Sequence, residues 1–534
     1  MPGTHLIFFR RILLLIAASL IAGCATIPPG AEYPREPSVA LAQPETTALG
    51  TAFAARFKEH SGMGGFRLLP SGTDGFVLRA EMAATAQRTI DLQYFIFHND
   101  ITGRLLLDEL LEAADRGVRV RILLDDLNLK GKDTQITTVA AHPNVQVRIF
   151  NPASYRGPLF PVRAAEFALD WTRLTYRMHN KLFLVDNVIG VAGGRNVGDE
   201  YFSTAKDFEF GDFDVFTVGP AVRRLSNSFD AYWNSSLAIP VQALGSAPTP
   251  QALEKYRAEL KEHHEKYAKE EYMRQVAAHN PLDSIVSGKD PLVWANFQVL
   301  YDSPEKEKVE KGELDGHLLR GRLTEAMRTV NNELLIVTPY LVPGPAQLEL
   351  LANLRARGVR IRILTNSLES TDVPVVHAGY RKYRIPMLER GIELYEVRNE
   401  LGRPTVNTRG RTEALKGDES DLYALHAKVY VFDRSKVFVG SANFDHRSFR
   451  LNTEVGVMID SPQIAAQVAQ RFAAITQPAN SYRVSLEKDE QGTQRLVWHT
   501  EEDGKPVDYT DEPGSAWREF EVDLMSVLPI ESQL

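Results

Sequence analysis

The chain has 534 residues, of which 44% are hydrophobic and 24% charged, a composition that excludes a disordered chain and predicts more than one globular core. The net charge of −8 argues mildly against DNA or RNA as the main substrate, because nucleic-acid binders usually carry a basic excess. The single cysteine, Cys24, excludes an internal disulfide and a cysteine-based metal site.

Residues 1–23 have the pattern of a signal peptide. Arg10 and Arg11 precede a short apolar run, Ile12 to Ile21, which is followed by small residues. That run is shorter than the about 20 apolar residues that span a bilayer. We therefore expect export rather than a membrane-spanning helix.

The four residues that end at Cys24, IAGC, resemble a bacterial lipobox. The resemblance implies that residues 24–47 are a lipidated cysteine followed by a tether, anchored in a bacterial cell envelope and facing the periplasm. By resemblance to bacterial sorting rules, Ala25 favours the outer over the inner membrane. A plain signal peptide, or a short uncleaved anchor with a chance cysteine, is the alternative.

One structural unit occurs twice in the chain. RGVRVRILLDD at Arg116 to Asp126 recurs as RGVRIRILTNS at Arg357 to Ser367. Upstream of each copy lie a strand-like run with a tyrosine, Tyr94 or Tyr340, and a helical pattern closed by glycine. We predict an α/β fold of two similar βαβ domains, each a mixed or mostly parallel sheet flanked by helices.

The composition along the chain predicts the domain boundaries. The first half covers 48–250 and the second 291–480. The charged helical pattern of 251–290 predicts a linker between them. Residues 481–534 form a C-terminal extension with a hairpin that turns at Gln491-Gly492.

Two segments, HNKLFLVDNVIGVAGGRN and HAKVYVFDRSKVFVGSAN, carry five identical residues at identical spacing. These are His179, Lys181, Asp186, Gly193 and Asn196 in the first half, and His426, Lys428, Asp433, Gly440 and Asn443 in the second. A lone His-x-Lys pair would be an ordinary core or surface pair, but its repetition in each half makes that interpretation poor. Residues two apart on a strand share a face, so each histidine and lysine should point the same way.

The two halves together would supply two histidines, two lysines and two asparagines. Lysine and asparagine donate hydrogen bonds to nonbridging phosphate oxygens, which stabilises charge that develops at phosphorus. One histidine can attack the phosphorus while the other protonates the leaving oxygen. The lysines supply the positive charge, so we expect no metal and no cofactor.

These segments resemble the HKD motifs of the phospholipase D superfamily, and the resemblance covers nearly the whole chain after the tether. It implies two halves about a pseudo-two-fold axis and a phosphohistidine intermediate. It makes His179 the nucleophile and His426 the general acid, with the reverse assignment open. The residues that would hold the phosphoryl group are Lys181, Lys428, Asn196 and Asn443.

Acidic residues should support this site in two ways. Asp186 and Asp433 lie at the far end of the strand, so we expect them to serve as scaffold within the motif. An acid further along should orient each histidine through its other ring nitrogen. Glu454 fits in the second half; in the first half Asp212 and Asp214 are both candidates, and Asp214 is favoured.

The halves differ at one motif position. The family has Gly-Ser after the aspartate, as in Gly440-Ser441, whereas the first half has Gly193-Gly194. This puts the role of the serine in doubt on that side. Gly193, Gly440 and Ser441 remain candidate substrate-binding positions.

Three further stretches, GGRNVGDEYF, residues 366–384 and the terminal PIESQL, resemble the cardiolipin synthase C subgroup. The resemblance implies phosphatidyl transfer to phosphatidylglycerol, with phosphatidylethanolamine or a second phosphatidylglycerol as donor. His377 and Tyr380 lie in one of these stretches. With Tyr94 and Tyr340 they are candidates for a substrate pocket, ordinary packing being the alternative.

Two alternative functions remain at this point. One is a hydrolase acting on phospholipid or, less favoured by the acidic charge, on nucleic acid. The other is a membrane-tethered lipid-binding protein without catalysis, which the two intact motifs disfavour. The expected partners are phospholipids at a membrane surface and no nucleic acid; a small accessory protein is raised only by the resemblance.

Overall fold

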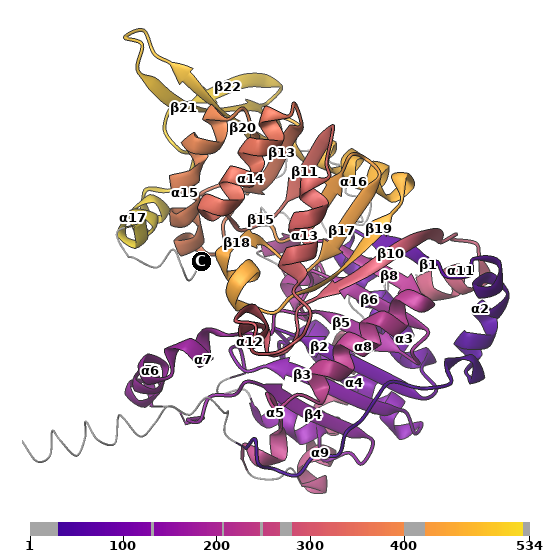
Figure 1. Ribbon diagram of the computed structural model, residues 1–534. Helices are drawn as coiled ribbons and strands as arrows, with labels where there is room; N and C mark the ends of the chain where they lie inside the picture. Colours follow the sequence, from indigo (N-terminus) through magenta and orange to yellow (C-terminus); the bar gives the residue numbers. More distant parts are fainter. Residues whose placement is uncertain are drawn as a thin grey trace, which may run out of the picture.

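The computed structural model describes residues 30–129, 133–157, 159–205, 208–245, 249–267, 280–399 and 422–526 (Figure 1). The predicted signal peptide, Cys24 and the terminal PIESQL lie outside these ranges. Among the described residues, no helix combines the length and the apolar character needed to cross a membrane.

The first half begins with alternating strands and helices and ends with a run of strands, a helix and a short strand. They are α2 (Ala48–Glu59), β1 (Gly64–Leu69), α3 (Gly72–Thr85), β2 (Thr89–Tyr94), α4 (Ile101–Asp115), β3 (Arg119–Asp125), α5 (Asp133–Val139), β4 (Val145–Phe150), α6 (Phe160–Leu169), α7 (Trp171–Thr175), β5 (Leu182–Val185), β6 (Ile189–Gly193), β7 (Phe208–Gly211), β8 (Asp214–Val218), α8 (Pro220–Trp233) and β9 (Ala238–Pro240). Two helices follow before the second half, α9 (Pro250–Tyr267) and α11 (Pro281–Ser287).

The second half repeats this order. Its elements are β10 (Val293–Tyr301), α12 (Lys306–Glu310), α13 (Leu319–Arg328), β11 (Glu333–Val337), β12 (Leu341–Val342), α14 (Gly344–Ala356), β13 (Arg360–Asn366), α15 (Pro374–Glu389), β14 (Glu393–Val397), β15 (Leu422–Leu425), β16 (Val429–Phe432), β17 (Lys436–Gly440), β18 (Phe444–Asp445), β19 (Val455–Asp460) and α16 (Pro462–Ile475). The C-terminal extension holds β20 (Ser481–Lys488), β21 (Gln494–Glu502), β22 (Lys505–Tyr509) and α17 (Ala516–Ser526).

The repeat predicted from RGVRVRILLDD and RGVRIRILTNS is present as β2–α4–β3 and β11–α14–β13. The strand pairs β2–β3 and β11–β13 are parallel. A glycine lies two residues after the end of each helix, Gly117 after α4 and Gly358 after α14, with φ angles of 92° and 88° in the left-handed region that side chains disfavour. The expected α/β fold of two similar halves is confirmed.

The main strands form one continuous mixed sheet of 18 strands. Outward from the junction, the order β8-β6-β5-β2-β3-β4 in one half matches β19-β17-β16-β11-β13-β14 in the other. This is the order that a pseudo-two-fold axis produces. Parallel pairing in this sheet is confined to β2-β3-β4 and β11-β13-β14, and the remaining described pairs are antiparallel.

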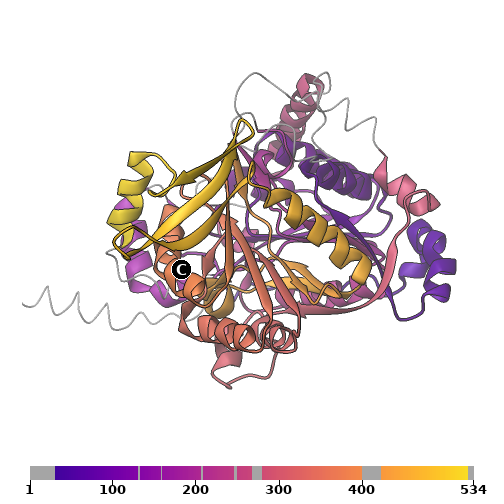
Figure 2. The ribbon, with the colours of Figure 1, turned by 90° about the horizontal axis from the view of Figure 1, so that it is seen from above.

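The halves meet at several places. Strand β10 pairs with β1 on one edge and β19 on the other, and β7 pairs in parallel with β15. Apolar residues of both halves, including those of α8 and α16, share one central buried cluster. In Figure 2 the second half, drawn in orange, lies against the first, drawn in purple. The junction therefore brings the two motif segments into one region.

The segment predicted as a linker packs on the first half. Helix α9 buries Leu253, Tyr256 and Leu260, and Arg257 on the same helix pairs with Asp115 of α4 at 2.7 Å. In the C-terminal extension, β20 adds to the edge strand β14, and the β20–β21 turn contains Gly492 at a φ of 81°.

Candidate active site

Each motif histidine and lysine lies in an extended segment directly before a buried strand. His179 and Lys181 precede β5, and His426 and Lys428 precede β16. All four residues of each strand are buried, so the apolar run fixes the polar segment at the edge of the core.

The motif aspartates occupy the turns at the other end of these strands, with φ angles of 52° at Asp186 and 48° at Asp433. Asp186 accepts hydrogen bonds from the backbone N–H groups of Gln87, Arg88 and Thr89 at 2.8–3.0 Å. Asp433 accepts the equivalent three, from residues 331, 332 and 333, at 2.7–2.9 Å. Both carboxylates thus fasten a strand end to the start of β2 or β11, a scaffold arrangement.

The backbone of each histidine is held by the opposite half. The N–H of His179 donates to the carbonyl oxygen of Thr453 at 2.9 Å, and that of His426 to Gly211 at 2.8 Å. Thr453 and Gly211 directly precede Glu454 and Asp212 in the sequence. Each acid is therefore delivered to the histidine of the other half.

The rings are oriented by these two acids. His179 Nδ1 lies 2.9 Å from Glu454 Oε2, and His426 Nδ1 lies 2.6 Å from Asp212 Oδ2. A ring that donates through Nδ1 presents the lone pair of Nε2. Within the described ranges neither Nε2 has a protein hydrogen-bond partner, so both remain open to a substrate.

The expected contact between Asp214 and a histidine is wrong. Asp214 Oδ2 accepts from Arg79 at 2.8 Å, and Asp214 Oδ1 accepts from the N–H of Arg195 at 3.2 Å. Strand register gives the reason, because Gly193 faces Asp214 while Gly440 faces Gly456. The first-half residue equivalent to Glu454 therefore lies two positions before Asp214, at Asp212.

The two lysines lie buried beside the histidines. Lys181 Nζ donates to the carbonyl oxygen of His179 at 2.5 Å, and Lys428 Nζ donates to that of His426. Burial, opposed by nearby acids, lowers the pKa of Lys428 to about 8 and that of Lys181 well below 10.5. Burial and then the lysine charges lower the pKa of both histidines well below 6.5. These mutual effects place all four side chains in one electrostatic cluster.

This electrostatic cluster predicts a bell-shaped pH profile for kcat/KM. The attacking histidine must be neutral, so the rate should rise with pH through a pKa below 6.5. The Lys428 ammonium must stay charged and His426 must hold the proton that it gives to the leaving group, so the rate should fall as the pH rises, at the latest through the Lys428 pKa of about 8. Initial rates from pH 4 to 11 measure both limbs, and an alkaline limb near the ordinary lysine value of 10.5 would contradict this assignment.

The asparagines are both buried but differently engaged. Asn196 Oδ1 accepts from the N–H of Ile96 at 3.1 Å, and its Nδ2 donates to Tyr201 at 3.0 Å. Asn443 Oδ1 has no partner among the described residues. The two motif amides are therefore not equivalent without substrate.

The motif serine and glycines lie in close contact with acidic residues or with a neighbouring strand. Ser441 Oγ donates to Glu454 Oε2 at 2.5 Å. Gly194 is the equivalent position in the first half. A Cβ there would lie 2.2 Å from Asp212 Oδ1, so the Asp212 carboxylate occupies the space that a serine side chain would need. At Gly193 and Gly440, a Cβ would meet Asp214 at 2.2 Å and the Val455 carbonyl at 2.5 Å. These positions permit close strand approach.

Of the four tyrosine and histidine candidates for a substrate pocket, Tyr340 is linked to the site through Asp372. Its hydroxyl donates to Asp372 at 2.8 Å, and Asp372 acts on the pKa of Lys428. Tyr94 is fully buried and accepts from Arg79 at 2.9 Å, which makes it part of the scaffold.

His377 and Tyr380 belong to a buried polar network instead of a pocket. His377 lies 2.7 Å from Glu512, and the Tyr380 hydroxyl donates to Glu396 at 2.8 Å. Arg384 pairs with both acids, at 2.6 and 2.9 Å. These contacts favour the alternative interpretation for the pair, ordinary packing of α15 against β14 and the C-terminal extension.

A supporting ion pair within the second half was not predicted. Lys306 and Asp302 are fully buried and paired at 3.0 Å. Lys306 Nζ also donates to the carbonyl oxygens of Ser448 and Asn452, and Asp302 Oδ2 accepts from the N–H of Glu454 at 3.1 Å. The pair holds the segment that carries Glu454. No local pattern signals it, because it depends on residues about 150 positions apart.

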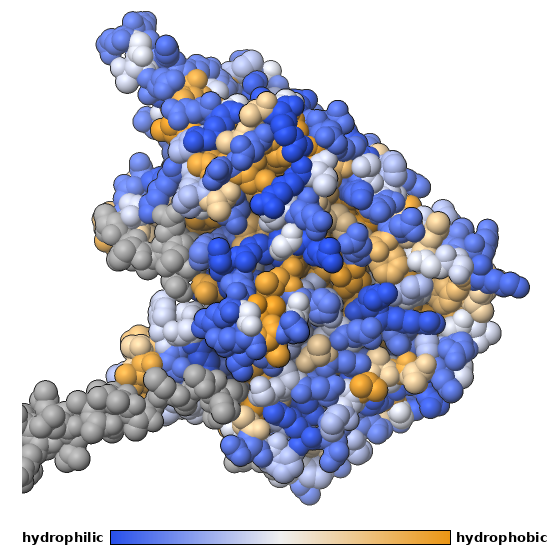
Figure 3. All heavy atoms as spheres, viewed as in Figure 1, coloured by the Kyte–Doolittle hydropathy of each residue, from blue (hydrophilic) through white to orange (hydrophobic). Residues whose placement is uncertain are grey.

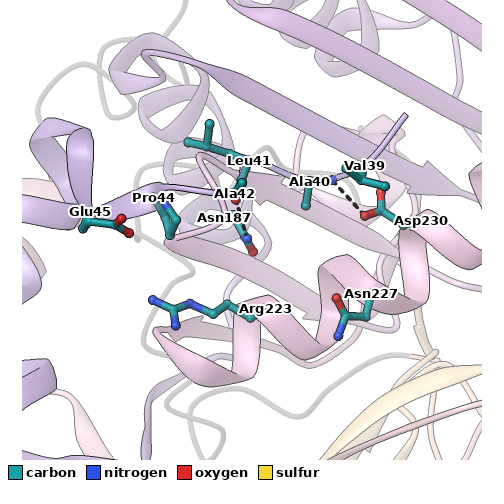
Figure 4. A pocket seen from close by; sticks show the side chains of 10 residues that line it. All are labelled: Val39, Ala40, Leu41, Ala42, Pro44, Glu45, Asn187, Arg223, Asn227 and Asp230. Carbon is teal, nitrogen blue, oxygen red and sulfur yellow. Dashed lines mark hydrogen bonds between the residues drawn. The ribbon is translucent and has the colours of Figure 1, made fainter. Parts of the chain in front are cut away.

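A separate surface cavity of about 470 Å³ lies between the N-terminal segment and α8 (Figure 4). Its lining includes Leu41, Asn187, Arg223 and Asp230, and none of the motif residues. Asp230 accepts from the N–H of Ala40 at 2.8 Å, so the cavity wall is tied down by the segment it borders. This cavity is not the site of the histidine pair.

Comparisons with known proteins agree with the twofold arrangement. The family model "Cardiolipin synthase, PLD-like domain" matches residues 80–233 and 323–476, one motif in each. Cardiolipin synthase C of Escherichia coli (strain K12) is 36% identical over 90% of this chain and 99% of its own. A cardiolipin synthase of Oceanobacillus iheyensis is 26% identical over 81% and 71%. Phosphatidylserine synthase of Haemophilus influenzae Rd KW20 shares the fold, with a TM-score of 0.50 at 15% identity over 81% and 92%.

Proposed function

Because the chain belongs to the cardiolipin synthase family with phospholipase D-like domains, we propose that it joins two phospholipids into cardiolipin. It is a phosphatidyltransferase of the phospholipase D superfamily, similar to cardiolipin synthase C. The proposed acceptor is phosphatidylglycerol, and the proposed donor is phosphatidylethanolamine or a second phosphatidylglycerol. The observation that carries the proposal is the pair of histidines, each fixed through Nδ1 by an acid of the opposite half.

In the first proposed step, Nε2 of His179 attacks the phosphorus of the donor. A P–N bond forms, the P–O bond to the headgroup breaks, and His426 gives its proton to the departing alcohol or amino alcohol. Lys181 and Lys428 hold the nonbridging oxygens, whose negative charge the buried ammonium groups stabilise. The product is a phosphatidyl group on His179.

In the second step, the neutral His426 takes the proton from a hydroxyl of phosphatidylglycerol. The resulting oxygen attacks phosphorus, the P–N bond breaks, and cardiolipin leaves with His179 restored. Water in place of this hydroxyl would give phosphatidic acid. Transfer thus requires that the acceptor lipid occupy the position that water would otherwise take.

We also propose that lipidation of Cys24 anchors the chain in the bacterial envelope with its site facing the periplasm. The support is the lipobox-like IAGC and the basic and apolar residues before it. Ala25 favours the outer membrane. Fractionation with labelled fatty acid tests this, since a Cys24→Ser variant should lose the label and the outer-membrane location.

A lipid assay tests the transfer. The chain and a His426→Ala variant receive phosphatidylglycerol in mixed micelles, with and without phosphatidylethanolamine. We expect cardiolipin from the parent, and a rate at least about 10³-fold lower from the variant, which lacks the proton donor. Release of ethanolamine or glycerol identifies the donor. Phosphatidic acid as the sole product would make the enzyme a hydrolase, and no turnover of either lipid would contradict the proposal.

A further inference from the structure

Helix α6 has an unusual surface for a globular protein. Its sequence FPVRAAEFAL is mostly apolar, yet none of its described side chains is buried. Phe160 is 76% exposed and Leu169 64%, and the adjoining Leu159 and Trp171 are 59% and 42% exposed. A helix in water normally buries its apolar face against the protein. The exposed apolar face of α6 therefore indicates that another molecule or surface covers it.

Helix α17 also exposes large apolar side chains, but on one face only. Trp517, Phe520 and Leu524 are 67%, 57% and 59% exposed, and their spacing of three and four residues places them on one face. The opposite face packs on the protein, with Val522 fully buried against Leu368 and Ala378. The packed face of α17 anchors the helix, and its outer face is an apolar stripe.

The two helices lie on the same side of the molecule. In Figure 1, α17 lies above α6 at the left, and in Figure 2, viewed from above, both lie at the left edge. Figure 3 shows apolar atoms over α6 at this edge. Of the thirteen exposed large apolar side chains among the described residues, eight lie on or next to α6, α7 and α17, so they are gathered and not scattered.

Both helices are attached to segments that border the histidine pair. Helix α7 continues α6 and ends at Thr175, four residues before His179. On α17, Arg518 donates to the carbonyl oxygen of Thr371 at 2.8 Å, next to the Asp372 that contacts Tyr340. A surface that binds both helices would therefore be held beside the site.

We propose that α6–α7 and α17 lie in the interfacial layer of a phospholipid bilayer and hold the site against its lipid headgroups; this rests on the proposed function. The helices have ten and eleven residues, too few to span a bilayer. Their exposed Phe and Trp side chains are of the kind that reside at the membrane interface.

The charges of α17 indicate which force would bind this helix to a bilayer. Its sequence AWREFEVDLMS holds three acidic residues and one arginine, so anionic headgroups do not attract it. Burial of apolar surface carries the interaction. Binding should therefore change little between low and high salt, unlike the binding of a basic patch.

The test uses the full chain in vesicles of phosphatidylglycerol and phosphatidylethanolamine with brominated acyl chains, which quench nearby tryptophan fluorescence. Trp233 and Trp498 are buried, and the half-buried Trp294 is common to the parent and all variants, so differences in quenching between them report on Trp171 and Trp517. We expect salt-insensitive quenching in the parent. Two triple variants each keep one reporter, Trp171 in Trp517→Gln/Phe520→Gln/Leu524→Gln and Trp517 in Phe160→Gln/Leu169→Gln/Trp171→Gln. The quenching of the reporter that remains should be reduced in both.

Activity on two lipids separates docking from structure. Each triple variant should transfer phosphatidyl groups in long-chain vesicles at least about tenfold more slowly, because less apolar surface enters the bilayer. The rate on short-chain phosphatidylglycerol dissolved as monomers should stay within about twofold of the parent. Val39→Gln is the matched control, since Val39 is 61% exposed but lies beside α8, and it should change neither rate.

The other outcomes overturn the proposal. Equal losses on both lipids would make the helices structural, and an unquenched parent would exclude bilayer contact. If sedimentation shows that the parent is a dimer and that the α17 variant is a monomer, a second copy of the chain, not a bilayer, covers these helices. A parent that is quenched but transfers neither lipid would disprove the proposed function while leaving the docking surface intact.

Discussion

The replacement Asp212→Asn is expected to lower the rate of phosphatidyl transfer by roughly 10²–10⁴-fold with little loss of folding stability. The fully buried carboxylate receives the Nδ1–H of His426 at 2.6 Å and stabilises the imidazolium that forms when this histidine takes a proton. An amide of the same size carries no charge and can donate to Nδ1, which favours the wrong tautomer. Activity on phosphatidylglycerol and the free energy of unfolding measure both effects.

The matched variant is Glu454→Gln, which addresses His179 in the same way. If Asp212→Asn retains full activity, the orienting role assigned to Asp212 is wrong. A loss of activity that merely follows a loss of folded protein would also contradict it. The crosswise contacts predict that either substitution disables the whole enzyme, because each histidine depends on an acid from the other half.

The replacement Asp214→Ala has the largest expected effect on stability. Asp214 and Arg79 are 0% and 1% exposed and paired at 2.8 Å, so the substitution leaves a buried guanidinium without its carboxylate. Breaking a buried pair in this way costs about 3–5 kcal/mol in the free energy of unfolding. Chemical denaturation of the parent and the variant measures this difference.

Two controls sharpen this result. Removing both charges, in Arg79→Met/Asp214→Ala, should recover part of the loss, because the Arg79 guanidinium is no longer buried without its carboxylate. Breaking the exposed pair of Lys311 and Glu307 by Glu307→Ala should cost far less, because solvent screens the two charges. A cost for Asp214→Ala no larger than that of Glu307→Ala would show that the buried pair does not support the fold.

The motif spacing predicted the parts of the site that lie within one half. Each histidine and lysine lies in the extended segment before one strand and each aspartate in the turn after it, so the local backbone geometry fixes their relative positions. The repeat likewise predicted the βαβ units, since their elements are consecutive in the sequence. These features depend on local structure, which the sequence pattern encodes directly.

The contacts between the halves were beyond the sequence pattern. The segment from Asn196 to Asp212 is longer than that from Asn443 to Glu454, so counting from the motif did not separate Asp212 from Asp214. Only the register of β6 with β8 distinguishes them. Similarly, the partner of His377 is Glu512, 135 residues away, and no spacing rule joins these two residues.

Trapping of the covalent intermediate tests the central claim most directly. The parent chain is mixed with phosphatidylglycerol labelled at phosphorus, quenched in alkali and digested, and the labelled peptide is sequenced. The account predicts one alkali-stable, acid-labile phosphoryl group per chain, bound to His179 and absent from a His179→Ala variant. Label on serine, aspartate or lysine, or turnover without any labelled peptide, would contradict it.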